Sequence, residues 1–145
     1  MLPIFVYGTL RPGEPNHALF LRGRTVAEEP ARMSGMALYD GPGYPYAVEG
    51  LGDGSGERHG GAGEVSGEIV SALPDDYAEL LCALDRLEEY APGDPANLYE
   101  RVERPATLAD GTVVRAWVYV AAPTVAAGLR ARGRLIESGD WRLRA

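Results

Sequence analysis

Short runs of apolar residues, separated by glycine and proline, recur along this chain. The first run, LPIFVY at residues 2–7, predicts a buried strand. Weaker strand patterns follow at 32–39, 44–48 and 64–71. Because these runs are short and rich in Val, Ile and Tyr, they favour a protein built from many short strands over a bundle of helices.

The clearest hairpin is expected near the C-terminus, where Asp110-Gly111 separates strand patterns at 101–108 and 112–121. Asp-Gly between alternating apolar residues is the strongest short-range hairpin signal. The second strand alternates between an aliphatic side (Val114, Ala116, Val118, Val120) and a mixed polar and aromatic side (Arg115, Trp117, Tyr119). This alternation is typical of a barrel wall that lines a pocket.

One segment has a clear helical period. Residues 75–90 follow Pro74, and Asp76 with Glu79 fits the spacing of a capping box. Apolar side chains recur at helical spacing and predict one buried stripe, formed by Tyr77, Leu80, Leu81, Leu84 and Leu87.

A single carboxylate falls on that stripe. At about 100° per residue, Glu88 lies within about 45° of the stripe centre, whereas Glu89 projects about 145° away. An inward carboxylate in the last helical turn is disfavoured by burial and by the helix dipole, and both effects raise its pKa, as suits a general acid or base. The alternative is a structural role, in which Glu88 caps the stripe or pairs with an arginine.

Composition narrows the function classes. The chain has 145 residues, about one ordinary domain (1–145), and a net charge of −7, which disfavours nucleic acid as a partner. All 14 basic residues are arginine, so mechanisms that need a lysine Schiff base or a P-loop lysine are excluded. Cys82 has no second cysteine to pair with, and the sequence contains no run of 18 apolar residues. These features predict a cytoplasmic protein without a membrane segment.

The segment 50–63, GLGDGSGERHGGAG, has too few apolar residues to pack and is expected to form a mobile loop. It does not match a dinucleotide-binding fingerprint, because His59 occupies the third glycine position. His17 and His59 also lack metal-ligand spacing with Cys82, so neither a metal nor a cofactor is expected.

Several motifs in order along the chain resemble the γ-glutamylcyclotransferase-like family, which includes γ-glutamylamine cyclotransferases and the plant AIG2-like proteins. The motifs are VYGTLR (6–11), LDRLEEY (84–90), LYERV (98–102), WVYV (117–120) and SGDW (138–141). The resemblance spans nearly the whole chain. One departure is Glu89, where many relatives have glycine.

The resemblance implies an α+β fold, a small mixed-sheet β-barrel with flanking helices. It also implies cleavage of a small-molecule γ-glutamyl amide without metal or cofactor, releasing 5-oxoproline and an amine. Tyr7, Gly8, Thr9 and Leu10 match the loop that holds the glutamyl group, and Glu88 matches the catalytic glutamate. Backbone N–H groups of such a turn form an anion nest, and glycine lets the backbone approach a ligand closely.

Three further residues are weaker candidates from the residue pattern alone. Arg11 could hold a carboxylate, although a solvated surface arginine is the more common case. Tyr99 and Tyr119 could line the cavity, although strand aromatics are more often core residues. The competing functions are a non-catalytic binding module for a small acidic metabolite and a metal-dependent hydrolase, for which the sequence offers no ligand set.

Overall fold

A computed structural model describes residues 1–50 and 63–144 of the chain. Its strands are β1 (Ile4–Val6), β2 (Thr25–Ser34), β3 (Met36–Tyr39), β4 (Tyr46–Glu49), β5 (Glu64–Ala72), β6 (Tyr99–Leu108) and β7 (Val113–Ala121). Its helical elements are η1 (His17–Leu21), η3 (Pro74–Asp76), α1 (Tyr77–Leu87), α2 (Pro123–Arg132) and η4 (Trp141–Leu143). The glycine-rich loop expected at 50–63 lies almost entirely outside the described residues.

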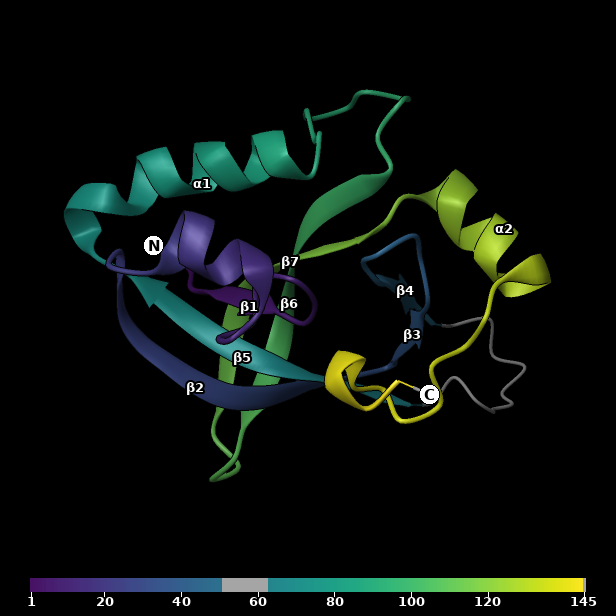
Figure 1. Cartoon of the computed structure of the whole chain (residues 1–145), viewed down its shortest axis with the longest axis horizontal. Helices are drawn as coiled ribbons and strands as arrows, with labels where there is room; N and C mark the ends of the chain where they lie inside the picture. Colours follow the sequence, from purple (N-terminus) through teal and green to yellow (C-terminus); the bar gives the residue numbers. More distant parts are fainter. Residues whose placement is uncertain (51–62, 145) are drawn as a thin grey trace.

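Five strands close into a barrel in the order β1-β5-β2-β6-β7. The barrel closes where β1 pairs in parallel with β7, at Ile4 and Trp117, while the other barrel pairings are antiparallel. Strands β3 and β4 form a separate two-stranded sheet. Helix α1 and η1 lie over one side of the barrel, and α2 lies beyond the β3–β4 sheet (Figure 1). The predicted mixed-sheet barrel with flanking helices is confirmed.

The sequence predicted the presence of the strands better than the residues at which they begin and end. The hairpin around Asp110-Gly111 is confirmed as β6 and β7, which pair from Tyr99–Ala121 to Thr107–Val113. The single strand expected at 32–39 is wrong, because the chain turns at Gly35, whose positive φ of 77° ends β2 and starts β3. The first part of β2, which includes Pro30, was missed because its side chains are mostly exposed and its apolar residues do not alternate with polar ones.

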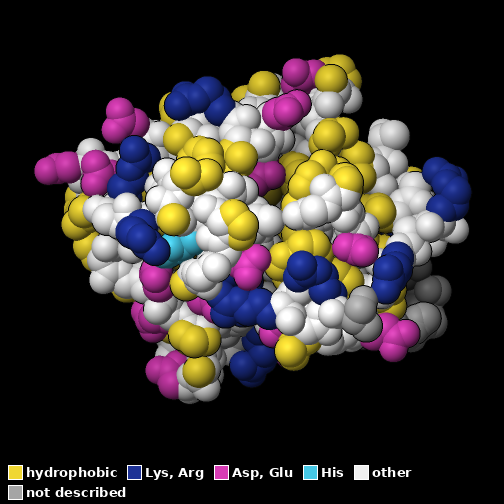
Figure 2. All heavy atoms as spheres, in the orientation of Figure 1, with side chains coloured by type: hydrophobic (Ala, Val, Ile, Leu, Met, Phe, Trp, Pro, Cys, Tyr) yellow, Lys and Arg dark blue, Asp and Glu magenta, His cyan; other side chains and the backbone are white. Residues whose placement is uncertain are grey.

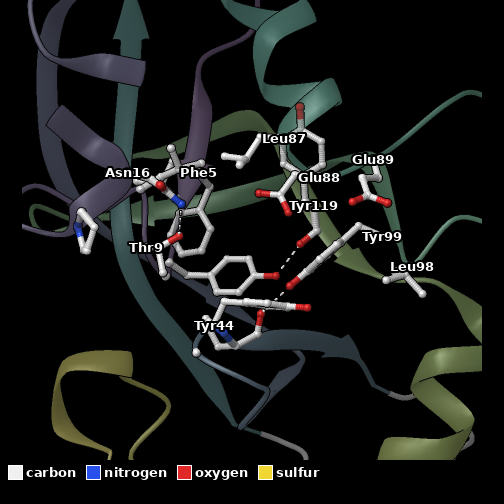
Figure 3. A pocket seen from close by; sticks show the side chains of 17 residues that line it. Phe5, Thr9, Asn16, Tyr44, Leu87, Glu88, Glu89, Leu98, Tyr99 and Tyr119 are labelled. Atoms are coloured by element: carbon white, nitrogen blue, oxygen red, sulfur yellow. Dashed lines mark hydrogen bonds between the residues drawn. The ribbon is translucent and has the colours of Figure 1, made fainter. Parts of the chain in front are cut away.

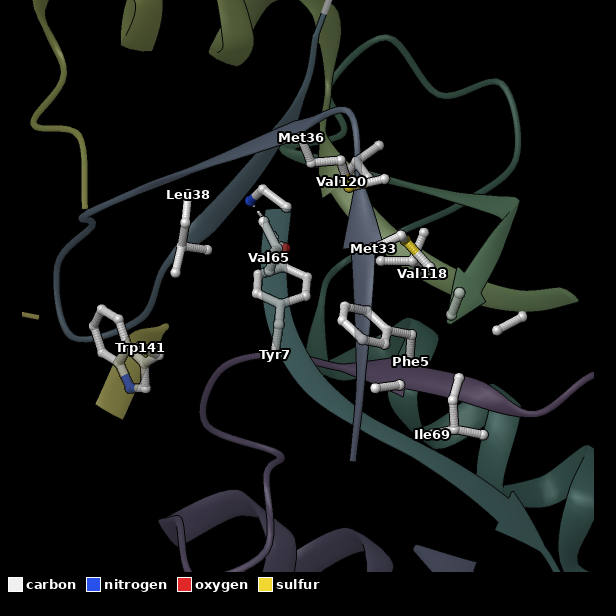
Figure 4. Close-up of a cluster of buried hydrophobic side chains, with 14 of the residues drawn as sticks. Phe5, Tyr7, Met33, Met36, Leu38, Val65, Ile69, Val118, Val120 and Trp141 are labelled. Atoms are coloured by element: carbon white, nitrogen blue, oxygen red, sulfur yellow. Dashed lines mark hydrogen bonds between the residues drawn. The ribbon is translucent and has the colours of Figure 1, made fainter. Parts of the chain in front are cut away.

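Two layers of apolar side chains hold the barrel together. One fills its interior and includes Phe5, Met33, Val65, Ile69 and Val118, which point toward one another in Figure 4. The second cluster includes Ile4, Leu80, Leu84, Tyr99 and Tyr119. Alternate residues of β1 and β7 therefore face the two layers, which confirms the two-sided pattern expected for β7.

Helix α1 is shorter than the predicted helix and begins differently. Residues 74–76 form a 3-10 turn, the α-helix covers Tyr77–Leu87, and Glu88 is its C-cap. The predicted capping box is wrong, because the side chain of Asp76 makes no capping hydrogen bond. Asp76 has helical dihedral angles (φ −100°, ψ −7°), whereas a capping side chain needs an extended backbone to reach the following N–H groups.

Arg11 is a buried structural residue and not the solvated surface arginine expected. Its guanidinium donates to both oxygens of Glu68 on β5, at 2.8 and 3.0 Å, and to Asp140 Oδ1 at 2.7 Å. Arg11 is 5% exposed and Glu68 is 8% exposed. This bidentate pair fixes the turn after β1 to β5 and to the C-terminal segment.

We expect Arg11→Met to lower the free energy of unfolding by about 3 kcal/mol, because it leaves the buried carboxylate of Glu68 without its bidentate partner. Arg32→Met is the matched control, since the Arg32–Glu64 pair has side chains that are 44% and 50% exposed. It is expected to cost less than about 1 kcal/mol. Urea unfolding at pH 7 measures both, and equal losses would contradict a structural role for the Arg11 network.

Candidate active site

A pocket of about 430 Å³ opens between the turn that follows β1, the C-terminal end of α1 and the starts of β4 and β6. Figure 2 shows a hollow at the centre of this face, with hydrophobic side chains on both sides of it. The side chains that line the pocket include Phe5, Thr9, Asn16, Tyr44, Leu87, Glu88, Glu89, Leu98, Tyr99 and Tyr119 (Figure 3).

The turn Tyr7–Leu10 forms one wall of the pocket. A Cβ on Gly8 would lie 2.7 Å from Cδ of Pro45, so glycine is needed here for packing against the opposite wall. No described residue accepts a hydrogen bond from the backbone N–H groups of Gly8, Thr9 or Leu10. Unpartnered N–H groups in a turn beside a pocket are suited to bind an anion.

The side chain of Thr9 also lies in the pocket, and Asn16 holds it there. Asn16 Nδ2 donates to Thr9 Oγ1 at 2.8 Å, and the Asn16 backbone N–H donates to the Thr9 carbonyl at 3.0 Å. The Thr9 hydroxyl therefore keeps its own proton available as a donor. The stretch 12–17 had no role in the sequence analysis, but Pro15 and Asn16 line the pocket.

Buried tyrosines form the floor and far wall. Tyr7 donates its hydroxyl proton to the Tyr119 carbonyl at 2.5 Å and accepts from the Ala47 N–H at 3.2 Å, and Tyr99 donates to the Pro45 carbonyl at 2.8 Å. Burial raises the pKa of Tyr7, Tyr99 and Tyr119, and the nearby Glu88 contributes in the same direction. These hydroxyls are therefore neutral at physiological pH and rigidly held.

Glu88 projects into the pocket between these walls (Figure 3). Its backbone N–H donates to the Leu84 carbonyl at 3.0 Å, which continues the helix by one residue and keeps Glu88 on the buried stripe. Its carboxylate has no hydrogen-bond or ion-pair partner among the described residues. Burial raises the pKa of Glu88 from 4.5 to about 7.

The alternative in which Glu88 pairs with an arginine is wrong for the described part of the chain. Arg101, on β6, binds Asp85 one turn earlier on α1, at 2.9 and 3.2 Å. Tyr119 also donates to Asp85, at 2.6 Å. Arg101 lies over the rings of Tyr90 and Trp117, with its guanidinium carbon 5.6 and 4.4 Å from the ring centroids. Arg101, the arginine close to the C-terminal end of α1, therefore already pairs with Asp85 and is not available to Glu88.

Glu89 ends the helix in an unusual conformation. Its φ is 55°, and among the described residues it is the one residue other than glycine with a positive φ. The left-handed conformation at the position after the C-cap normally selects glycine. Glu89 is exposed and lines the pocket. The helical wheel directed it away from the stripe, but the wheel does not apply here because the chain leaves the helix at this residue.

The structure brings Tyr7, Gly8, Thr9, Leu10 and Glu88 to one pocket, as the sequence analysis required. Tyr99 and Tyr119, which the sequence analysis did not select, line the same pocket and are also buried. The alternation along β7 was the signal that could have selected Tyr119. Tyr44 fell in the strand pattern at 44–48 and Leu98 in the LYERV motif, but neither pattern marked them as pocket residues. Asn16 comes from a loop without a periodic pattern.

A family model described as "Gamma-glutamyl cyclotransferase, AIG2-like" matches residues 4–143. The chain belongs to this family. Among curated proteins, it is 36% identical over 119 residues to the gamma-L-glutamyl-butirosin B gamma-glutamyl cyclotransferase of Niallia circulans. That alignment covers 81% of this chain and 65% of the relative, so the chain spans less than two thirds of the relative's length.

Solved structures of similar proteins share the fold. An AIG2-like protein from Mus musculus is 26% identical with a TM-score of 0.61, covering 86% of this chain and 81% of that one. A protein from Pyrococcus horikoshii is 26% identical with a TM-score of 0.55, covering 97% and 90% of the two chains.

In the described part of the chain, no helix has the length and apolar character needed to span a membrane.

Glu89→Gly is expected to stabilise the protein by about 1 kcal/mol relative to Glu89→Ala. Both variants remove the same side chain, but only glycine adopts a positive φ without steric cost. Thermal or urea unfolding of the two variants measures the difference. A less stable glycine variant would show that the backbone at residue 89 is not held in the left-handed conformation.

The pKa of Glu88 can be tested without any substrate. Because burial raises it from 4.5 to about 7, the folded protein holds a proton that the unfolded chain has released. The stability contributed by this proton is fully present below about pH 4.5 and is lost as the pH rises through about 7. The replacement Glu88→Gln, which cannot ionise, should therefore gain stability relative to wild type as the pH rises.

We expect Glu88→Gln to exceed wild type by about 1–3 kcal/mol in free energy of unfolding at pH 8 and to match it near pH 4. Urea unfolding across this pH range measures the difference. Glu79→Gln, an exposed position on the same helix, is the matched control. A difference between Glu88→Gln and wild type that does not vary with pH would rule out a raised pKa at Glu88.

Proposed function

We propose that this protein is a γ-glutamyl cyclotransferase that cleaves a γ-glutamyl amine or peptide to 5-oxoproline and a free amine. One observation carries the proposal. Among the described residues, neither the Glu88 carboxylate, with its pKa near 7, nor the N–H groups of the turn on the facing wall have a hydrogen-bond partner. Membership of the γ-glutamyl cyclotransferase, AIG2-like family and the activity named for the Niallia circulans relative support it.

In this reaction the substrate supplies its own nucleophile. The Glu88 carboxylate takes a proton from the α-ammonium group, and the freed nitrogen attacks the γ-carbonyl carbon of the same molecule. A ring C–N bond forms, and the carbonyl oxygen becomes an oxyanion. No serine, cysteine or lysine of the protein is needed, because the pocket has only to hold the chain curled and to move one proton.

The oxyanion needs hydrogen-bond donors that are already in place. The N–H groups of Gly8, Thr9 and Leu10, together with the Thr9 hydroxyl, are donors on the pocket wall with no acceptor among the described residues. We assign them to the glutamyl carboxylate and to the developing oxyanion. The ring nitrogen, which still carries one proton more than in 5-oxoproline, releases that proton to water. When the tetrahedral intermediate collapses, Glu88 gives the proton it took to the departing nitrogen, the original amide C–N bond breaks, and the carboxylate is regenerated.

A non-catalytic binding module for a small acidic metabolite is the competing function. A protein that only binds an anion would not be helped by a half-buried, unpaired carboxylate, because that group repels the ligand and costs free energy on burial. A thermal shift with γ-glutamyl compounds in the absence of any product would favour the binding module over the enzyme.

Glu88→Gln is expected to lower kcat by about a hundredfold or more, because glutamine cannot accept the α-ammonium proton. The assay is mass-spectrometric detection of 5-oxoproline after incubation with a panel of γ-glutamyl amines and peptides. For wild type, kcat/KM should rise with pH through about 7, since the base is the ionised form of Glu88.

Glu79→Gln removes an exposed carboxylate from the same helix and serves as the control for altered net charge. Circular dichroism of both variants shows whether the fold is retained. Full 5-oxoproline production by a folded Glu88→Gln variant would refute the role of Glu88, and a wild type inactive on the whole panel would refute the enzyme.

A further inference from the structure

The charged side chains described in the pocket all carry negative charge. Among the described residues that line it, the charged side chains are Glu88 and Glu89, and no arginine is present. Arg101, the arginine bound to the same helix end, is held by Asp85 and packed between two aromatic rings. A substrate group placed near the two glutamates therefore meets negative charge and no cation among the described residues that line the pocket.

Glu89 lies on the opposite side of Glu88 from the turn that we assign to the glutamyl group. In Figure 3, Thr9 and Asn16 lie to one side of Glu88, and Glu89 and Leu98 lie to the other. If the glutamyl end is held at Thr9 and its γ-carbonyl reaches Glu88, the leaving amine extends toward Glu89 and Leu98. This side of the pocket is thus where the amine is selected.

The carboxylate of Glu89 is available to a ligand. It is exposed and has no hydrogen-bond or ion-pair partner among the described residues. The left-handed backbone at Glu89 directs the chain out of the helix and leaves this side chain on the pocket wall. Leu98, which lines the same pocket, is 43% exposed and offers an apolar surface for a short hydrocarbon stem.

We propose that Glu89 selects γ-glutamyl amines whose amine part carries a second, positively charged amino group on a short alkyl stem, the class of γ-glutamyl diamines. The stem packs on Leu98, and the distal ammonium group pairs with the Glu89 carboxylate. The inference rests on the proposed cyclotransferase activity and adds the chemical class of the leaving group to it.

Two matched substrates separate the charge from the size of the amine. N-(4-aminobutyl) γ-glutamyl amide ends in an ammonium group, and N-pentyl γ-glutamyl amide has a methyl group at the same position. We expect wild type to favour the charged substrate in kcat/KM by about three- to fivefold, the range for an ion pair near the surface. The preference should fall when NaCl is raised from about 0.05 to 0.5 M, because salt screens exposed charges.

Glu89→Gln keeps the size of the side chain and removes its charge. It should bring the ratio of the two kcat/KM values close to one. Glu79→Gln makes the same change in net charge on an exposed part of α1 outside the pocket, and it should keep the wild-type ratio. Using the ratio for each variant cancels any common loss from altered folding.

A wild-type ratio of one or less overturns the proposal, as does a Glu89→Gln variant that keeps the wild-type ratio or a Glu79→Gln variant that loses it equally. The neutral pentyl substrate distinguishes the two levels of inference. If wild type converts it to 5-oxoproline without preference for the charged substrate, only the role of Glu89 fails. If neither substrate yields 5-oxoproline, the cyclotransferase activity on such amines and the selectivity fail together.

Discussion

The ion pair between Asp85 and Arg101 determines the character of the pocket. It joins the last turn of α1 to β6, and Tyr119 on β7 binds the same carboxylate, so the end of the helix is fixed to two barrel strands at once. Because Arg101 and the Tyr119 hydroxyl both donate to Asp85, neither pairs with Glu88, which has no partner among the described residues. Burial then raises the pKa of Glu88, with no partner among these residues to stabilise its charged form.

On the opposite wall of the pocket, too, some groups hold the structure in place and others are available to a ligand. Arg11 fixes the turn after β1 by binding Glu68 and Asp140, and Asn16 holds the side chain of Thr9. The N–H groups of Gly8, Thr9 and Leu10 in this turn remain without acceptors among the described residues. A turn that is held in place by its side chains but keeps backbone donors available is preorganised, so little order has to be imposed when an anion binds.

Local patterns in the sequence predicted the hairpin at Asp110-Gly111, the two faces of β7 and the inward direction of Glu88, because each depends on a short-range period or turn. They could not predict that Arg11 is buried, since its partners Glu68 and Asp140 are 57 and 129 residues away in the chain. Tyr99 and Tyr119 were possible cavity residues from the sequence, and the alternation along β7 supported Tyr119, but local patterns did not separate them from ordinary core residues. Pairing the VYGTLR turn with Glu88 came from the family resemblance, which supplies long-range information that periodicity lacks.

Glu89 is where local rules and the observed structure disagree most. A helical wheel directs it away from the buried stripe, and its positive φ favours glycine, yet its side chain lies on the pocket wall. An unfavourable backbone conformation persists only where the surrounding structure imposes it, and such positions concentrate at functional sites. Here it lies directly beside a second unfavourable feature, the carboxylate of Glu88, which has no partner in the part of the chain that the structure describes. The positive φ of Glu89 and the carboxylate of Glu88 are both unfavourable and both lie at this pocket, whereas the nearby Asp85 and Arg101 pair with each other. A ligand explains these two features better than the fold does, because the barrel itself requires neither charge.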